Sequence, residues 1–194
     1  MFPNLIANVI DAFRNPRASA RTMMARTPDF ADAGLMIVFA YLVEVLAWIS
    51  VTAVIEGGFP PFSIAMRVGE LGLQLLTFTA MTYAAHQLGL RAGGKATRIQ
   101  IAGLIGWHSV VVASFSPLKV LGVHAAMTGQ GGFLFVLAPI SVGVTIWLFA
   151  SFIAEAHGFK RLGPVVAATV AGYVLLGAVL ALGLATLGLP GGGA

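Results

Sequence analysis

Residues 34–55 read GLMIVFAYLVEVLAWISVTAVI, an apolar run that only Glu44 interrupts with a charge. A helix that crosses the hydrocarbon of a bilayer needs about 20 predominantly apolar residues. The run is long enough for one such helix. Its apolar residues are continuous and do not alternate with a period of two, which favours a helix over a strand of a membrane barrel. This stretch predicts a helical membrane protein.

The composition of the whole chain agrees with that class. Of its 194 residues, 58% are hydrophobic and 9% are charged. A soluble domain carries charge on about a quarter of its residues, so this chain has too few charges to cover a surface exposed to water. It is also too hydrophobic to be disordered. The absence of cysteine excludes disulfides, thiolate metal ligands and a cysteine nucleophile.

The positions of the charges divide the chain into further spans. No Asp, Glu, Lys or Arg occurs in 71–90, 99–118, 120–154 or 162–194. Because residues 128–132 read TGQGG, which is typical of a turn, the longest of these runs is predicted to hold one helix after a loop. The fold predicted for domain 34–188 is an all-α bundle of five transmembrane helices over about 34–55, 68–90, 99–117, 133–154 and 164–187. A short flexible tail, 189–194, would follow.

Residues 1–33 form a segment of a different kind. Apolar residues recur on one face of a predicted helix, with polar side chains opposite, and these apolar residues are Leu5, Ile6, Val9, Ile10 and Phe13. Asn15 and Pro16 predict the N-cap and the first residue of a second short helix. Amphipathic helices of this kind lie in the headgroup plane with arginines near lipid phosphate. An alternative, compatible with the first, is that the segment caps the cytoplasmic ends of the spans.

The basic residues are distributed unequally between the two sides that five spans would create. Nine of the 11 Lys and Arg fall on one side. By the positive-inside rule this side is cytoplasmic, which places the N-terminus in the cytoplasm and the C-terminus outside. The basic residues expected to contact lipid headgroups or the cytoplasmic face are Arg14, Arg17, Arg21, Arg26, Arg91, Lys95, Arg98, Lys160 and Arg161.

Two ionisable residues are expected near the middle of the membrane. Glu44 lies ten residues into the first span and His108 nine residues into the third, which starts on the same side. Ionisable groups at this depth are costly and are candidates for function. We expect a hydrogen-bonded Glu44–His108 pair, which could exchange a proton near neutral pH. The alternative is that the pair only fixes helix packing.

Small residues recur at spacings that let helices approach closely, either within the chain or between copies of it. The predicted packing positions are Gly103, Gly106, Ala168, Gly172, Gly177, Ala181 and Ala185.

Motifs for catalysis and for nucleotide binding are missing from the sequence. Residues 89–95 have the G-x-x-x-x-G-K spacing of a phosphate-binding loop, but Ala96 replaces the Ser or Thr that would hold magnesium, and no strand is predicted before them. The four histidines are too dispersed to form a metal site. We therefore expect no enzyme activity, cofactor, nucleotide or nucleic acid.

Several short motifs resemble the Yip family of five-pass membrane proteins. Residues 93–100, GGKATRIQ, running on to Ser116 and Pro117, resemble that family's glycine pair before the third span and the proline after it. Residues 155–161, EAHGFKR, are similar to its fourth loop, and Asn15-Pro16 to its amino-terminal turn. Eukaryotic members bind prenylated Rab-type GTPases, but the Asp-Leu-Tyr-Gly-Pro element and the long soluble N-terminal region of those members are missing here. The resemblance therefore implies a short bacterial-type member in the cytoplasmic (inner) membrane.

Two functional hypotheses follow. The first is a non-enzymatic scaffold or accessory subunit that organises membrane lipids or partner membrane proteins, including further copies of itself, through its basic N-terminal segment. The second is a small proton-coupled transporter or permease that uses Glu44 and His108.

Overall fold

The computed structural model describes the backbone of residues 4–26, 29–129 and 132–186, and their side chains apart from those of residues 180, 181 and 183–186. The predicted tail, 189–194, and the predicted packing residues Ala181 and Ala185 fall outside this description. Within the described ranges all regular structure is helical and no strand is present. The elements are α1 (Leu5–Arg14), α2 (Pro16–Ala25), α3 (Phe30–Glu56), α4 (Ile64–Arg91), α5 (Arg98–Ala113), α6 (Ser116–Thr128), the 3₁₀ helix η1 (Gly132–Val136), α7 (Leu137–His157) and α8 (Gly163–Thr186).

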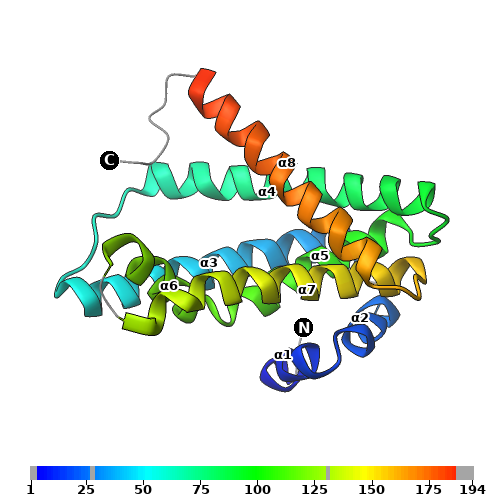
Figure 1. Cartoon of the computed structure of the whole chain (residues 1–194), viewed down its shortest axis with the longest axis horizontal. Helices are drawn as coiled ribbons and strands as arrows, with labels where there is room; N and C mark the ends of the chain where they lie inside the picture. The colour runs from blue at the N-terminus through cyan, green and yellow to red at the C-terminus, as the bar shows by residue number, and fades with distance from the viewer. Residues whose placement is uncertain (1–3, 27–28, 130–131, 187–194) are drawn as a thin grey trace.

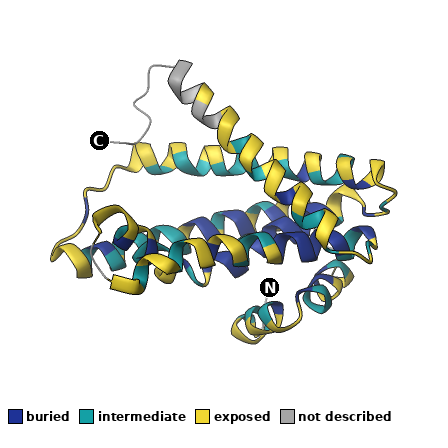
Figure 2. Ribbon diagram, in the orientation of Figure 1, coloured by how far each residue is buried: buried dark blue, intermediate teal, exposed yellow. Residues whose placement is uncertain are grey.

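Helix α5 is the centre of the bundle. It packs against α3, α4 and α7, and every one of its residues from Ile101 to Ala113 except Ser109 is buried. Helices α3, α4, α5 and α7 run along the long axis of the molecule, and α8 crosses them obliquely (Figure 1). Figure 2 shows that burial concentrates in α3, α5 and α7, whereas α4 and α8 are largely exposed. Their exposed faces are rich in Leu and Val, as expected of surfaces in contact with lipid.

Helix boundaries follow from local sequence. Asn15 accepts a hydrogen bond from the backbone N–H of Ala18 at 3.1 Å, which confirms the predicted N-cap of α2 with Pro16 at its first position. Capping boxes start α3, with Asp29 and Asp32, and α5, with Thr97 and Gln100. Helices α3, α6 and α7 each end at a glycine in the left-handed region: Gly57, Gly129 and Gly158.

Two helices in the described residues are long and apolar enough to cross a membrane. They are Phe30–Glu56 and Gly132–His157, and a third span is formed if α5 and α6, which are bent by 63° relative to each other, count as one. The apolar part of α8 that can be assessed covers Gly163–Val179. Helix α4 has 28 residues, but polar residues such as Arg67, Glu70 and Gln74 lower its hydropathy. The structure thus establishes an all-helical fold with two or three apolar candidate spans.

The connection after the third predicted span differs from the expected loop. Residues 118–128 are helical, and α6 starts at Ser116 directly after a break at Ser114 and Phe115. Pro117 in the first turn of α6 is compatible with a helix start, because the first turn needs no backbone donor. The turn signal at residues 128–132 does end a helix, but that helix is α6. Consequently α6 packs on α3 and α7 and brings Lys119 into the bundle.

Candidate functional site

Glu44 is bound by residues of α6 at the point where α6 meets α3. Its carboxylate accepts hydrogen bonds from Lys119 Nζ at 2.7 Å and from the Ser116 hydroxyl at 3.4 Å. The sequence lacked a signal for this contact because the pairing depends on the direction in which α6 turns after its break. The result is a carboxylate balanced by a cation, which lowers the cost of a charge inside an apolar bundle.

His108 has a different partner from the predicted one. Its Nε2 donates to the backbone carbonyl of Thr145 on α7 at 3.1 Å, and its ring packs edge-on against Phe149 and Phe152. The predicted Glu44–His108 hydrogen bond is therefore replaced by separate contacts with Lys119 and with the Thr145 carbonyl. The physical reason is that a lysine ammonium satisfies a carboxylate better than a neutral imidazole does.

Glu44 and His108 nevertheless line the same cavity. This cavity has a volume of about 180 Å³ and lies between α3, α4, α5, α7 and α8. Its polar lining residues are Glu44, Gln74, Thr77, His108, Ser109, Thr145 and Tyr173, and the remainder of the wall is apolar. The cavity is large enough for several waters. It could hold water, a proton or a small polar solute.

The N-terminal segment is a helical hairpin that is fixed onto the bundle. Arg21 of α2 forms an ion pair of 2.7 Å with Glu155 at the end of α7, and the Trp107 indole N–H of α5 donates to the Ser19 hydroxyl at 2.9 Å. The Arg17 guanidinium donates to the backbone carbonyl of Lys160 at 3.4 Å. The predicted apolar stripe of α1 is divided: some of its residues pack against the core while Ile6 and Ile10 are exposed.

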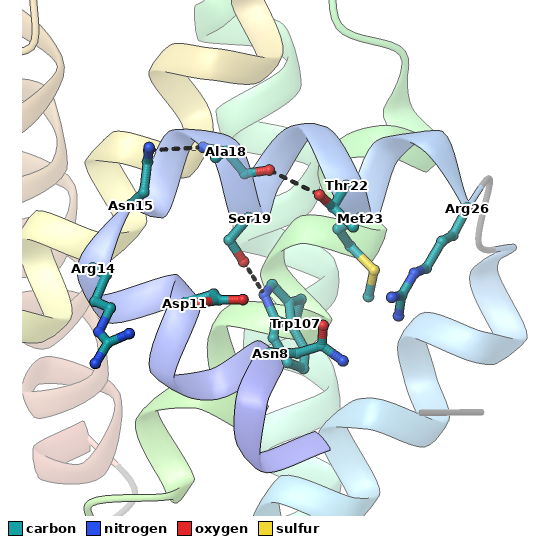
Figure 3. A pocket seen from close by; sticks show the side chains of 10 residues that line it. All are labelled: Asn8, Asp11, Arg14, Asn15, Ala18, Ser19, Thr22, Met23, Arg26 and Trp107. Atoms are coloured by element: carbon teal, nitrogen blue, oxygen red, sulfur yellow. Dashed lines mark hydrogen bonds between the residues drawn. The ribbon is translucent and has the colours of Figure 1, made fainter. Parts of the chain in front are cut away.

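A second, more polar pocket lies between α1 and α2. It has a volume of about 270 Å³, with Trp107 at its floor. The residues that line it are Asn8, Asp11, Arg14, Asn15, Ala18, Ser19, Thr22, Met23, Arg26 and Trp107 (Figure 3). In this view the Asp11 carboxylate points toward Ser19 and Trp107, while Arg14 and Arg26 lie at opposite rims. The sequence predicts that the two arginines contact lipid headgroups, but its pattern does not indicate that α1 and α2 enclose a pocket.

The predicted headgroup-contacting residues gather at one end of the molecule. Helix α2, the α4–α5 connection and the α7–α8 connection all lie there (Figure 1). The Ala96 N–H donates to His157 Nδ1 at 3.4 Å, which ties two of these segments together. Of the basic residues at this end, Arg98 lies 5.8 Å from the Tyr83 ring centre. The other exposed basic residues here are Arg21, Arg26, Arg91, Lys95, Lys160 and Arg161.

The predicted small-residue positions divide into two groups. Gly103 and Gly106 are buried in α5, and a Cβ at Gly106 would lie 2.9 Å from the Ala33 carbonyl oxygen. This glycine therefore permits close contact between α5 and α3. In α8, by contrast, Ala168, Gly172 and Gly177 are exposed, and nothing lies within 4 Å of a Cβ at either glycine. The predicted small residues of α5 thus lie in the core of the bundle, whereas those of α8 that the structure describes face outward.

No protein-family model, curated protein or solved structure matches this chain. In the described part of the chain, no group of three His, Asp or Glu side chains is placed to hold a metal ion.

Proposed function

We propose that the chain is a non-enzymatic integral membrane protein that acts as a scaffold or accessory subunit, organising membrane lipids or partner membrane proteins at its basic end. In this proposal it spans a bacterial inner membrane five times, with the N-terminus cytoplasmic and the C-terminus periplasmic, as a short relative of the Yip family. The observation that carries the proposal is the hairpin α1–α2, which is fixed to the bundle by Arg21–Glu155 and Trp107–Ser19 and presents an arginine-rimmed pocket.

Charge and burial support a binding role for this hairpin. Ala12, Ala20 and Met23 are buried in the core, so the hairpin has a fixed position on the bundle. Arginine side chains at such a surface attract lipid phosphate or acidic groups of a partner. Because the hairpin contributes to the core, removing residues 1–30 would also expose apolar surface. A point variant that undocks α2 is therefore the cleaner test.

The test is the charge reversal Arg21→Glu, which places a carboxylate opposite Glu155. Like charges at this distance repel, so the docking of α2 on the end of α7 should weaken while the long helices remain inserted. The lipids and proteins that co-purify with the full chain in mild detergent are then identified by mass spectrometry. We expect the variant to lose co-purifying lipids or partners that the wild type retains.

The swap Arg21→Glu with Glu155→Arg restores opposite charges and should restore those lipids or partners. Glu56→Arg, a charge reversal at an exposed residue at the far end of α3, serves as the matched control. An unchanged set of co-purifying lipids and proteins in Arg21→Glu would contradict the proposal.

A second candidate function is a proton-coupled transporter or permease. The cavity shared by Glu44 and His108 favours it, as does the 63° break between α5 and α6 beside Ser116 and Lys119. Broken helices next to a polar site inside the membrane are typical of transporters. Proteoliposomes loaded with a pH-sensitive dye test this candidate: the wild type should dissipate an imposed pH gradient faster than Glu44→Gln. Equal rates for wild type, variant and empty liposomes would reject it.

A further inference from the structure

The pocket between α1 and α2 carries both signs of charge at separate positions. Arg14 and Arg26 lie at opposite rims, and the Asp11 carboxylate lies between them and points toward Trp107 (Figure 3). Among the described residues, the Asp11 and Arg14 side chains form no hydrogen bond or ion pair. A purely anionic ligand would be attracted by the arginines but repelled by Asp11. The pocket therefore has the charge pattern for a ligand that is itself both anionic and cationic.

The arginine rims match a phosphate group. A guanidinium presents donors in a planar fork that fits two phosphate oxygens. The Arg26 guanidinium is directed toward Met23 and Trp107, whereas the Arg14 guanidinium points away from Trp107 (Figure 3). A phosphate at the Arg26 rim would thus lie over the pocket, and Arg14 would supply positive potential from the other side.

The floor of the pocket matches a primary ammonium. Such a group has three donors. The Asp11 carboxylate and the Asn8 side-chain amide provide acceptors, and the Thr22 hydroxyl, which donates to the Ala18 carbonyl at 3.1 Å, still has lone pairs to accept with. A quaternary ammonium has no donors and is recognised by a cage of several aromatic rings, but Trp107 is the sole aromatic residue of this lining.

We infer that this pocket binds the headgroup of an ethanolamine phospholipid, with its phosphate at the Arg26 rim and its ammonium at Asp11. The inference rests on the proposed function and names the lipid that the hairpin would engage. The volume of about 270 Å³ is close to the lower end of small-molecule sites, about 300–1,000 Å³, and so suits a headgroup better than a whole lipid. Ile6 and Ile10 on α1 are exposed and provide apolar surface for the acyl chains.

The experiment measures lipid retention by the full chain in detergent with native mass spectrometry. Phosphatidylethanolamine, phosphatidylglycerol and phosphatidylcholine with identical acyl chains are added separately. We expect the ethanolamine lipid to be retained preferentially, by about tenfold, the factor typical of one charged hydrogen bond. Asp11→Asn should remove this preference while phosphatidylglycerol is still bound, and Arg14→Gln with Arg26→Gln should weaken the binding of all three lipids.

Soluble glycerophosphoethanolamine distinguishes the two sources of this headgroup. If it displaces the lipid, the pocket recognises the headgroup alone; if it does not, recognition also needs the acyl chains, and either result supports the site. Glu56→Gln, at an exposed residue outside the pocket and away from the basic end, is the matched control, with thermal melting in detergent as the test of folding.

Equal retention of the three lipids, or an unchanged preference in Asp11→Asn, would overturn the inference. Neither result would contradict the proposed function, which fails only if undocking the hairpin with Arg21→Glu leaves the co-purifying lipids and partners unchanged.

Discussion

At the scale of single residues, the Glu44–Lys119 pair is the contact whose loss has the clearest consequence. The two side chains are 27% and 37% exposed, and they join α3 to α6 across the break that follows α5. In an apolar bundle, each charge of such a pair mainly offsets the free-energy cost of burying the other charge. A single substitution leaves one charge unbalanced, whereas a double substitution removes both charges.

Lys119→Met tests this point because methionine keeps the length of the side chain and removes its charge. We expect a loss of about 1–3 kcal/mol in stability, the usual cost of leaving a charged or buried polar group without its partner. Thermal melting in detergent measures the loss as a lower melting temperature. Glu44→Gln combined with Lys119→Met should recover most of it, and a double variant no more stable than Lys119→Met would contradict the role of the pair.

Gly106 offers a second test at this scale. A Cβ there would lie 2.9 Å from the Ala33 carbonyl oxygen and 3.2 Å from its Cα, and these backbone atoms cannot move aside easily. Gly106→Ala should therefore separate α5 from α3 and cost about 1–3 kcal/mol, as overpacking does. Gly172→Ala in α8 is the matched control, because nothing lies within 4 Å of its Cβ position. Equal melting temperatures for the two variants would show that α5 and α3 do not pack this closely.

At the scale of elements, the His157 side chain joins the end of α7 to α4 and to the α4–α5 connection. Its Nδ1 accepts from the Ala96 N–H, and its ring stacks on Phe159. A Cβ at Gly89 or at Gly94 would overlap the imidazole. The residues that had the spacing of a phosphate-binding loop therefore enclose a histidine of α7, and their glycines serve helix packing.

Because the imidazole fills the space beside Gly89, we expect substitutions at Gly89 and His157 to affect the melting temperature non-additively. Gly89→Ala should lower the melting temperature because the new methyl group displaces the imidazole. With His157→Ala in the background, the same change should cost far less, so the two substitutions should be strongly non-additive. Gly72→Ala in the same helix has open space around it and should be neutral or slightly stabilising, since alanine favours helices more than glycine does. Additive effects at Gly89 and His157 would contradict the arrangement.

The helical elements could be predicted from the sequence more fully than the contacts between them. Charge-free runs and cap residues such as Asn15 locate helices because both act locally. Helix α6 was missed because residues 118–132 contain glycines and a turn signal that read equally well as a loop. The Lys119–Glu44 pair and the pocket around Trp107 could not be predicted, since both depend on how separate helices pack.

At the scale of the whole molecule, the proposed five-span topology requires α4 to cross the membrane beside α3. Helix α4 carries Arg67 and Glu70, which would oppose insertion if they were isolated. They pair at 2.8 Å, Tyr41 donates to Glu70 at 2.9 Å, and the Arg67 guanidinium lies 4.2 Å from the Trp48 ring centre. These contacts with α3 lower the cost of burying the two charges, so α4 can cross the membrane beside α3.

Single-cysteine labelling tests the five-span topology directly, because the natural chain contains no cysteine to react. Lys95→Cys and Lys160→Cys lie in the connections at the basic end, and Pro61→Cys lies in the exposed connection between α3 and α4. In intact cells a membrane-impermeant thiol reagent should label Pro61→Cys alone, and all three should react after permeabilisation. If α4 did not cross, the cysteines at 61 and 95 would lie on the same side and react alike. That outcome would reduce the number of spans and would require a new assignment of the side on which the N-terminal hairpin meets its ligand.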